Sequence, residues 1–184
     1  MPALPKSIEQ QLATRPVETF APGELLFAPD AVATHVWFLR RGLVRVFTLD
    51  AAGNEFNHDF LGDGEWVVGR VAWRALDVCC AERALGAAAL RPSAAVRVGI
   101  AELDDWRGRD PEIAAYLVDT LMQLTAARYG READLAQRSA EQRYVELIGR
   151  HPELLNTVPL REIAAWLAIT PVALSRIRRR LGAR

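Results

Sequence analysis

The stretch of sequence that decides the fold is Leu160–Leu181, LREIAAWLAITPVALSRIRRRL. Its first half repeats apolar residues at the spacing of one helix face, and these residues are Leu160, Ile163, Ala164 and Leu167. Such a stripe predicts a short amphipathic helix, because the apolar side chains all project to one side.

A second helix is predicted to follow almost at once. Thr170 can accept a backbone N–H bond as an N-cap, and Pro171 suits the first helical position, where no N–H is required. The inward stripe of this helix consists of Leu174, Ile177 and Leu181. Only Ala168 and Ile169 remain between the helices, so the pair must cross sharply, as in a helix-turn-helix. The turn needs a positive φ at Ala168, which costs a non-glycine residue about 1 kcal/mol.

The outward face of the second helix is strongly basic. It carries Val172, Ser175, Arg176, Arg178, Arg179 and Arg180, and residues 171–184 contain five arginines and no acidic residue. A planar guanidinium donates two parallel hydrogen bonds to phosphate oxygens or to the O6 and N7 atoms of guanine. The face therefore predicts contact with double-stranded DNA. The alternative is a solvated basic helix end, which the helix dipole also favours.

The composition of the chain bounds its class. The 184 residues are 51% hydrophobic, carry no net charge and include two adjacent cysteines, Cys79 and Cys80. This length allows one ordinary domain and a small one. Neighbouring cysteines do not easily bridge each other, so they are either a redox site or two small buried apolar residues. Without a signal-peptide core or a membrane-spanning run, we expect a soluble cytoplasmic protein that does not bind membranes.

Metal and catalytic sites are not indicated by the sequence. The three histidines, His35, His58 and His151, are scattered, and no base–nucleophile pair occurs. An iron–sulfur sensor would need more cysteines than this chain contains. We therefore expect no metal, no cofactor and no catalytic residue, which argues against an enzyme of the cupin type.

Short strand-like runs fill the N-terminal half after a predicted leading helix over residues 8–14. The runs are residues 25–27, 35–40, 43–49, 55–61, 66–68, 85–90 and 95–100, most of them bounded by glycine-containing turns. Many short strands at close spacing predict a compact β-barrel or sandwich rather than a parallel sheet.

From about Ala101 the sequence becomes helical, so the predicted fold class is α+β. A long helix is predicted to begin at Pro111, with an apolar stripe of Ile113, Leu117, Leu121 and Leu124. The stripe is narrow enough for a coiled-coil seam and predicts a dimer interface; the alternative is packing on the chain's own β domain. Ser139 and Gln142 resemble a capping box that starts the next helix.

This order of elements resembles the Crp/Fnr family of transcription regulators. The segments that carry the resemblance are FAPGELLFAPD (20–30), HVWFLRRGLVRVFTLDAAGNE (35–55), residues 62–69, ERALGAAAL (82–90) and REIAAWLAITPVALSRIRR (161–179). The resemblance implies three parts: a β-roll (double-stranded β-helix) of the cyclic-nucleotide-binding type in residues 1–108, a long dimerisation helix in residues 109–137, and a helix-turn-helix in residues 138–184. Since the chain ends soon after Leu181, we expect no full C-terminal wing hairpin.

The resemblance also implies an effector pocket in the β-roll. In the family a Gly-Glu pair meets the ribose, and an arginine followed by Ser or Thr holds the cyclic phosphate. The matching positions here are Gly69, Arg70, Arg83 and Ala84. Arg70 reverses the charge of the glutamate and Ala84 lacks the hydroxyl, so we expect no response to cyclic AMP. Any effector is an unidentified small molecule, and Arg83 is otherwise a plain surface arginine.

The family's pattern also assigns roles on the second helix. It makes Pro171, Val172, Ser175 and Arg176 the base-reading residues, while Thr170, Arg178, Arg179 and Arg180 are expected at DNA phosphates. Pro171 and Val172 offer only apolar contact, for instance to a thymine methyl group, so the family's usual operator is not assumed.

The leading hypothesis is thus a homodimeric, sequence-specific DNA-binding transcription regulator, for which RNA polymerase is an expected further partner. The alternative is a ligand-binding or protein-interaction module with a degenerate helix-turn-helix. Ala168, Pro171 and the missing wing leave that alternative open.

Overall fold

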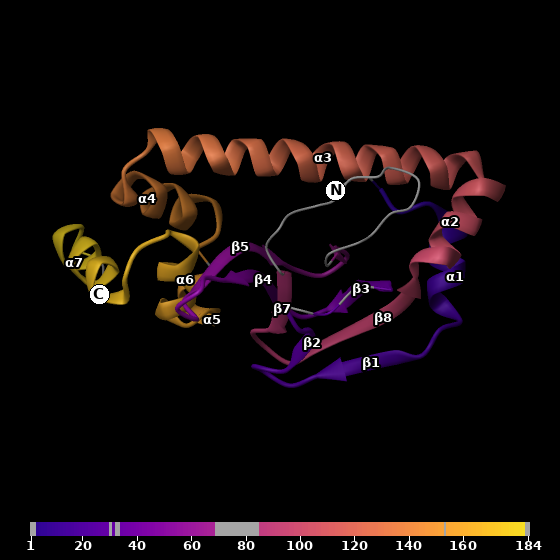
Figure 1. The fold of residues 1–184 in the computed structure, drawn as a ribbon, viewed down its shortest axis with the longest axis horizontal. Helices are drawn as coiled ribbons and strands as arrows, with labels where there is room; N and C mark the ends of the chain where they lie inside the picture. Colours follow the sequence, from indigo (N-terminus) through magenta and orange to yellow (C-terminus); the bar gives the residue numbers. More distant parts are fainter. Residues whose placement is uncertain (1–2, 30, 32–33, 69–84, 153, 183–184) are drawn as a thin grey trace.

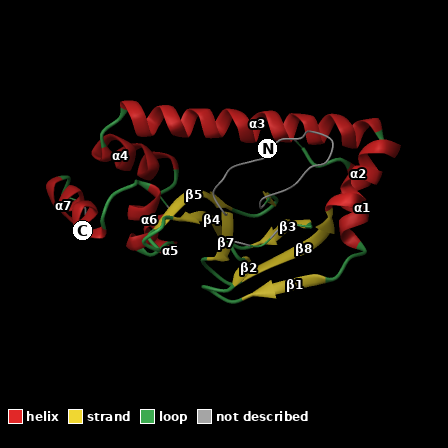
Figure 2. Ribbon diagram, in the orientation of Figure 1, coloured by secondary structure: helices red, strands yellow, loops and turns green. Residues whose placement is uncertain are grey.

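The computed structural model describes residues 3–29, 31, 34–68, 85–152 and 154–182. Within them, strands form one compact body, a long helix runs along the molecule, and short helices gather at the C-terminal end (Figure 1). Helices and strands are segregated rather than alternating, as Figure 2 shows, so the predicted α+β class is confirmed.

The strand region is an antiparallel sandwich of two four-stranded sheets. The strands are β1 (Val17–Phe20), β2 (Leu25–Phe27), β3 (His35–Arg41), β4 (Val44–Leu49), β5 (Glu55–Leu61), β6 (Trp66–Val67), β7 (Leu85–Ala89) and β8 (Ser93–Gly99). One sheet has the order β1-β8-β3-β6 and the other β2-β7-β4-β5. Each predicted strand is present among them. β1 was not predicted, because three of its four residues are exposed and the segment lacks an alternating apolar pattern.

The space between the two sheets is filled by apolar side chains. They are Phe20, Leu26, Trp37, Leu39, Val44, Val46, Leu61, Val67, Leu85, Ala87, Ala89 and Ala95. The strands leave the sheets at close turns, and Gly42 between β3 and β4 has φ 130°. A Cβ at Gly42 would lie 2.2 Å from the hydroxyl oxygen of Ser93, so only glycine fits this turn.

Seven helices are described outside the sandwich. They are α1 (Lys6–Ala13), α2 (Ile100–Arg109), α3 (Pro111–Gln137), α4 (Ala140–Arg150), α5 (Leu154–Thr157), α6 (Leu160–Trp166) and α7 (Pro171–Arg180). The predicted capping box opens α4, because Ser139 and Gln142 exchange backbone-to-side-chain hydrogen bonds at 2.8 and 3.2 Å. The long helix begins as predicted at Pro111 and continues through Gly130 to Gln137.

The outer face of the β1-β8-β3-β6 sheet is covered by α1, α2 and the first turns of α3. The shared core consists of Ile8, Leu12, Val36, Phe38, Trp66, Val96, Val98, Leu103, Trp106, Ile113, Tyr116 and Leu117. Within it, the indole nitrogen of Trp66 donates to the hydroxyl of Tyr116 at 2.9 Å. This packing fixes the start of α3 on the sandwich, and the rest of the helix carries the chain to the C-terminal helices (Figure 1). None of the helices described is long and apolar enough to cross a bilayer.

Candidate nucleic-acid interface

The C-terminal helices form a helix-turn-helix with its own core. α6 and α7 pack through Ile163, Ala164, Leu174 and Ile177, each at most 7% exposed. Ala168 has φ 55° in the connecting turn, as the sequence predicted. The backbone N–H of Ile169 donates to the carbonyl oxygen of Ala164 at 3.0 Å, which closes the turn between the two helices.

The start of α7 is fixed locally by its own residues. The hydroxyl of Thr170 accepts a hydrogen bond from the backbone N–H of Ala173 at 3.2 Å, and Pro171 occupies the first turn. Both features are as predicted. The helix therefore begins at a defined residue, and its side chains project in defined directions.

The residues assigned to bases and phosphates lie on one helix but differ in exposure. Thr170, Pro171, Val172, Ser175, Arg176, Arg179 and Arg180 are exposed, whereas Arg178 is half-buried. Among the described residues, Arg176 and Arg179 make no ion pair or side-chain hydrogen bond. These two guanidinium groups are free to meet a ligand anion or a base edge.

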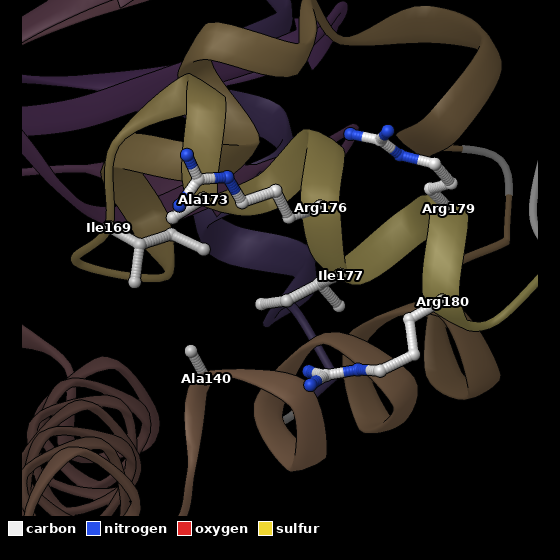
Figure 3. Close-up of a pocket in the computed structure, with 7 residues that line it drawn as sticks. All are labelled: Ala140, Ile169, Ala173, Arg176, Ile177, Arg179 and Arg180. Atoms are coloured by element: carbon white, nitrogen blue, oxygen red, sulfur yellow. The ribbon is translucent and has the colours of Figure 1, made fainter.

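The basic face borders a hollow between α7 and the start of α4. It is lined by Ala140, Ile169, Ala173, Arg176, Ile177, Arg179 and Arg180 (Figure 3). Arg180 extends toward α4, where it forms an ion pair with Glu141, whereas the guanidinium groups of Arg176 and Arg179 point away from α4. Arg180 therefore ties α7 to α4 in this structure.

Two arginines that could not be singled out from the sequence bind the end of α6, next to the turn of the helix-turn-helix. The guanidinium of Arg143 on α4 donates to the carbonyl oxygen of Leu167 at 2.8 Å. Arg131 on α3 donates to the carbonyl oxygen of Trp166 and lies 3.9 Å from the centre of its indole ring. Burial, with Arg143 nearby, lowers the pKa of Arg131 to about 10, so the group stays charged at neutral pH.

These arginines satisfy the carbonyl groups at the C-terminal end of α6, which have no partner within the helix. No spacing in the sequence links residues 131 and 143 to residues 166 and 167, so local pattern could not reveal them.

The predicted dimer stripe on α3 divides into two parts in the structure. Ile113 and Leu117 are 3% and 6% exposed and belong to the core of their own chain, while Leu121 and Leu124 are half-buried. A second stripe of apolar residues on the same helix is exposed instead: Val118 at 57%, Met122 at 69% and Tyr129 at 69%.

The four residues assigned to the effector pocket, Gly69, Arg70, Arg83 and Ala84, lie outside the described residues, as do Cys79 and Cys80. In the part of the β-roll that is described, the interior is apolar. No group of three or more metal-ligating side chains occurs among the described residues.

Comparison with known proteins places these observations in a family. Residues 17–105 match the model of the cyclic nucleotide-binding domain. The β-roll is a cyclic nucleotide-binding domain. No curated protein matches this chain in sequence.

The described part of the chain has the fold of Crp/Fnr regulators, with the cyclic nucleotide-binding domain toward its N-terminal end. It matches FixK2 from Bradyrhizobium japonicum at a TM-score of 0.75 and 18% identity, covering 92% of this chain and 85% of that one.

Two further solved structures show the same arrangement. The global regulator CLP from Xanthomonas campestris, which responds to c-di-GMP, has a TM-score of 0.72 and 17% identity, covering 97% of this chain and 91% of that one. A transcriptional regulator of the Crp/Fnr family from Eubacterium rectale has a TM-score of 0.76 and 11% identity, covering 97% and 84%. The predicted resemblance in fold is thereby confirmed, and the neighbours are transcription regulators rather than enzymes.

Proposed function

We propose that this protein is a homodimeric transcription regulator that binds double-stranded DNA through α7. The observation that carries the proposal is the pair of free, exposed arginines, Arg176 and Arg179, on a helix that is capped and packed as the second helix of a helix-turn-helix. Such helices enter the major groove of B-DNA with their N-terminal residues toward the base edges.

Base reading is assigned to the exposed residues of the first two turns. Arg176 donates two hydrogen bonds to the O6 and N7 atoms of a guanine, which is the commonest specific contact in the major groove. Val172, 62% exposed, suits a thymine methyl group, with Pro171 and Ser175 beside it. The operator therefore combines a guanine with a neighbouring thymine in each half-site.

Phosphate binding is assigned to the remaining polar residues of the helix. Arg179 is free to approach the backbone directly, and Thr170 lies exposed at the helix start. Arg180 must exchange Glu141 for a phosphate, and Arg178 must leave its half-buried position. Among these residues Arg179 contributes most to the electrostatic part of binding.

Dimerisation is assigned to α3. The exposed residues Val118, Met122 and Tyr129 are spaced by four and seven, which is the period of a coiled-coil seam, and Leu121 borders them. The helix has 27 residues, so a second copy packed along it makes a long contact of about 40 Å. Ile113 and Leu117 pack in the core of their own chain, and Leu124 is half-buried.

We expect the cyclic nucleotide-binding domain of this protein not to respond to cyclic AMP. Arg70 and Ala84 replace the residue types that the family uses for the ribose and the cyclic phosphate. The domain therefore responds to another small molecule or acts without one.

The experiment that tests the proposal is a fluorescence anisotropy titration of the purified protein against random duplex DNA at 50 and 200 mM salt. A DNA-binding protein of this kind binds random duplex in a manner that weakens steeply with salt, because counterions are released from the phosphates. Absence of binding at both salt concentrations contradicts the proposal and favours a protein-interaction module.

A further inference from the structure

The helix-turn-helix is attached to the cyclic nucleotide-binding domain by a buried polar contact between β5 and α6. Asn57 on β5 has no exposed surface, and its side-chain nitrogen donates to two atoms of Glu162 on α6. The distances are 2.9 Å to the carbonyl oxygen and 3.1 Å to the carboxylate. One side chain of the sandwich thus holds both the backbone and the side chain of the first helix of the helix-turn-helix.

An ion pair belongs to the same contact between the sandwich and α6. The guanidinium of Arg45 on β4 lies 2.9 Å from a carboxylate oxygen of Glu162, whose side chain is 4% exposed. Arg45 also donates to Glu55 at 2.8 Å and to the amide oxygen of Asn57 at 3.2 Å. The other carboxylate oxygen of Glu162 accepts from the neighbouring Arg161 at 3.0 Å. Both oxygens of this buried carboxylate are therefore satisfied, and two of its three partners belong to the sandwich.

Apolar contacts surround the polar contact. Leu43 is a buried member of the core formed by the C-terminal helices, and Phe60 and Leu90 pack against that core from the sandwich. Leu43 just before β4, Phe60 on β5 and Leu90 just after β7 thus contribute to the core of the helix-turn-helix, and the two bodies lie side by side in Figure 1.

A buried ion pair constrains the relative orientation of two packed bodies more tightly than an apolar contact does. Apolar surfaces tolerate sliding, whereas a buried carboxylate that loses its partner leaves an uncompensated charge in a poorly hydrated place. α6 lies between β5 and α7 in Figure 1, and Arg176 and Arg179 on α7 are exposed, so this contact orients α7 without covering these arginines.

We propose that Arg45, Asn57 and Glu162 are positioning residues that couple the β4–β5 hairpin to α6 and thereby set the direction in which α7 is presented. This inference rests on the proposed function only for its consequence on DNA. Because β4 also pairs with β7, a displacement of β7 in the sandwich is transmitted through the hairpin to the helix-turn-helix.

The orientation of the helix-turn-helix relative to the sandwich can be measured in the absence of DNA. Spin labels are placed on cysteines at the exposed positions Val17 and Val172, in a background with Cys79→Ser and Cys80→Ser. Labelled protein is diluted with excess unlabelled protein, so that only distances within one protomer are measured by pulsed electron resonance. We expect a single narrow distance distribution in the parent protein and a distribution at least about twice as broad after Glu162→Gln.

Matched variants separate coupling from general destabilisation. Arg161→Gln removes a partner of Glu162 that lies on α6 itself. Glu55→Gln removes a partner of Arg45 that makes no hydrogen bond or ion pair with α6 among the described residues. Both are expected to leave the distribution narrow. Arg45→Met breaks the pair from the sandwich side and is expected to broaden it as Glu162→Gln does, which keeps the test decisive if either variant fails to fold.

A second experiment, with DNA, tests what the contact between β5 and α6 contributes to DNA binding. The parent protein is expected to select half-sites at one spacing, while Glu162→Gln accepts spacings that differ by one base pair. Unchanged distance distributions in both Glu162→Gln and Arg45→Met overturn the inference. Failure of the parent protein to bind DNA contradicts the proposed function instead, because the distance measurement does not involve DNA.

Discussion

Arg143 donates a hydrogen bond from its guanidinium to the carbonyl oxygen of Leu167, at 2.8 Å, and thereby joins α4 to the end of α6. The side chain is 8% exposed and also donates to the carbonyl oxygen of Arg138. The carbonyl groups at the end of a helix need such partners when they are buried. The turn that follows Leu167 is therefore held at its first residue, immediately before the strained Ala168.

Replacing Ala168 with glycine is expected to stabilise the protein. Ala168 has φ 55°, where a Cβ costs about 1 kcal/mol relative to glycine. For a chain of this size the midpoint of thermal unfolding should rise by about 2 °C. Ala165→Gly, in the last turn of α6, is the matched control and should lower the midpoint. Equal losses in both variants contradict the assigned turn.

Arg176→Ala is expected to weaken binding to cognate DNA by about 1 to 3 kcal/mol and to relax specificity at one base position. Arg176 is exposed and unpaired among the described residues, so its removal leaves the fold intact. Anisotropy titration against cognate duplexes with single substitutions measures the effect. The same loss on random and cognate DNA would rule out base reading by this residue.

Arg179→Ala is expected to weaken binding to all sequences alike. It removes one phosphate contact, so the slope of log K against log salt should become less steep by about 1. Arg109→Ala is the control, because Arg109 is exposed, forms an ion pair with Asp105 and ends α2, a helix that lies far from α7 in Figure 1. A salt slope unchanged by Arg179→Ala would place this residue away from DNA.

Met122→Glu is expected to break the dimer. Met122 is 69% exposed in the single chain, so the carboxylate costs the fold little, whereas in the seam it is desolvated and opposes its own copy. Sedimentation equilibrium should show a dimer dissociation constant at least about tenfold higher. Gln123→Glu adds the same charge beside the seam and should leave the dimer intact. A dimer equally stable in both variants would move the interface elsewhere.

The sandwich is expected to lose stability in acid partly through Glu55. The hydrogen bond from Arg45 lowers the pKa of Glu55 below its ordinary value of 4.5. A lowered pKa means that the charged form stabilises the folded state; this contribution is complete above pH 4.5 and is lost as the pH falls through the folded-state pKa. Urea unfolding between pH 6 and pH 3 should show a smaller loss for Glu55→Gln than for the parent. Parallel profiles would exclude this contribution.

The sequence was sufficient wherever structure is set by neighbours along the chain. Ala168, Thr170 and Pro171 define the turn of the helix-turn-helix within four consecutive positions, and Ser139 with Gln142 defines the start of α4. Their geometry depends on local backbone chemistry, which a short segment already contains.

The sequence was insufficient where structure depends on contacts between distant segments. The stripe that begins with Ile113 looked suitable for a partner helix, yet Ile113 packs under its own sandwich. Periodicity shows that one face of a helix is apolar but not what covers it. Asn57 and Glu162 are 105 residues apart, and their contact arises only from the way β5 and α6 pack.

Selection of bound sites from a random DNA library, using the purified full chain, tests the central claim most directly. We expect near-palindromic sites whose half-sites lie about 34 Å apart, each with a guanine that Arg176→Ala no longer requires. Enrichment of no sequence above the starting library, or of sites without two-fold symmetry, would contradict a dimer that presents two copies of α7 to successive major grooves.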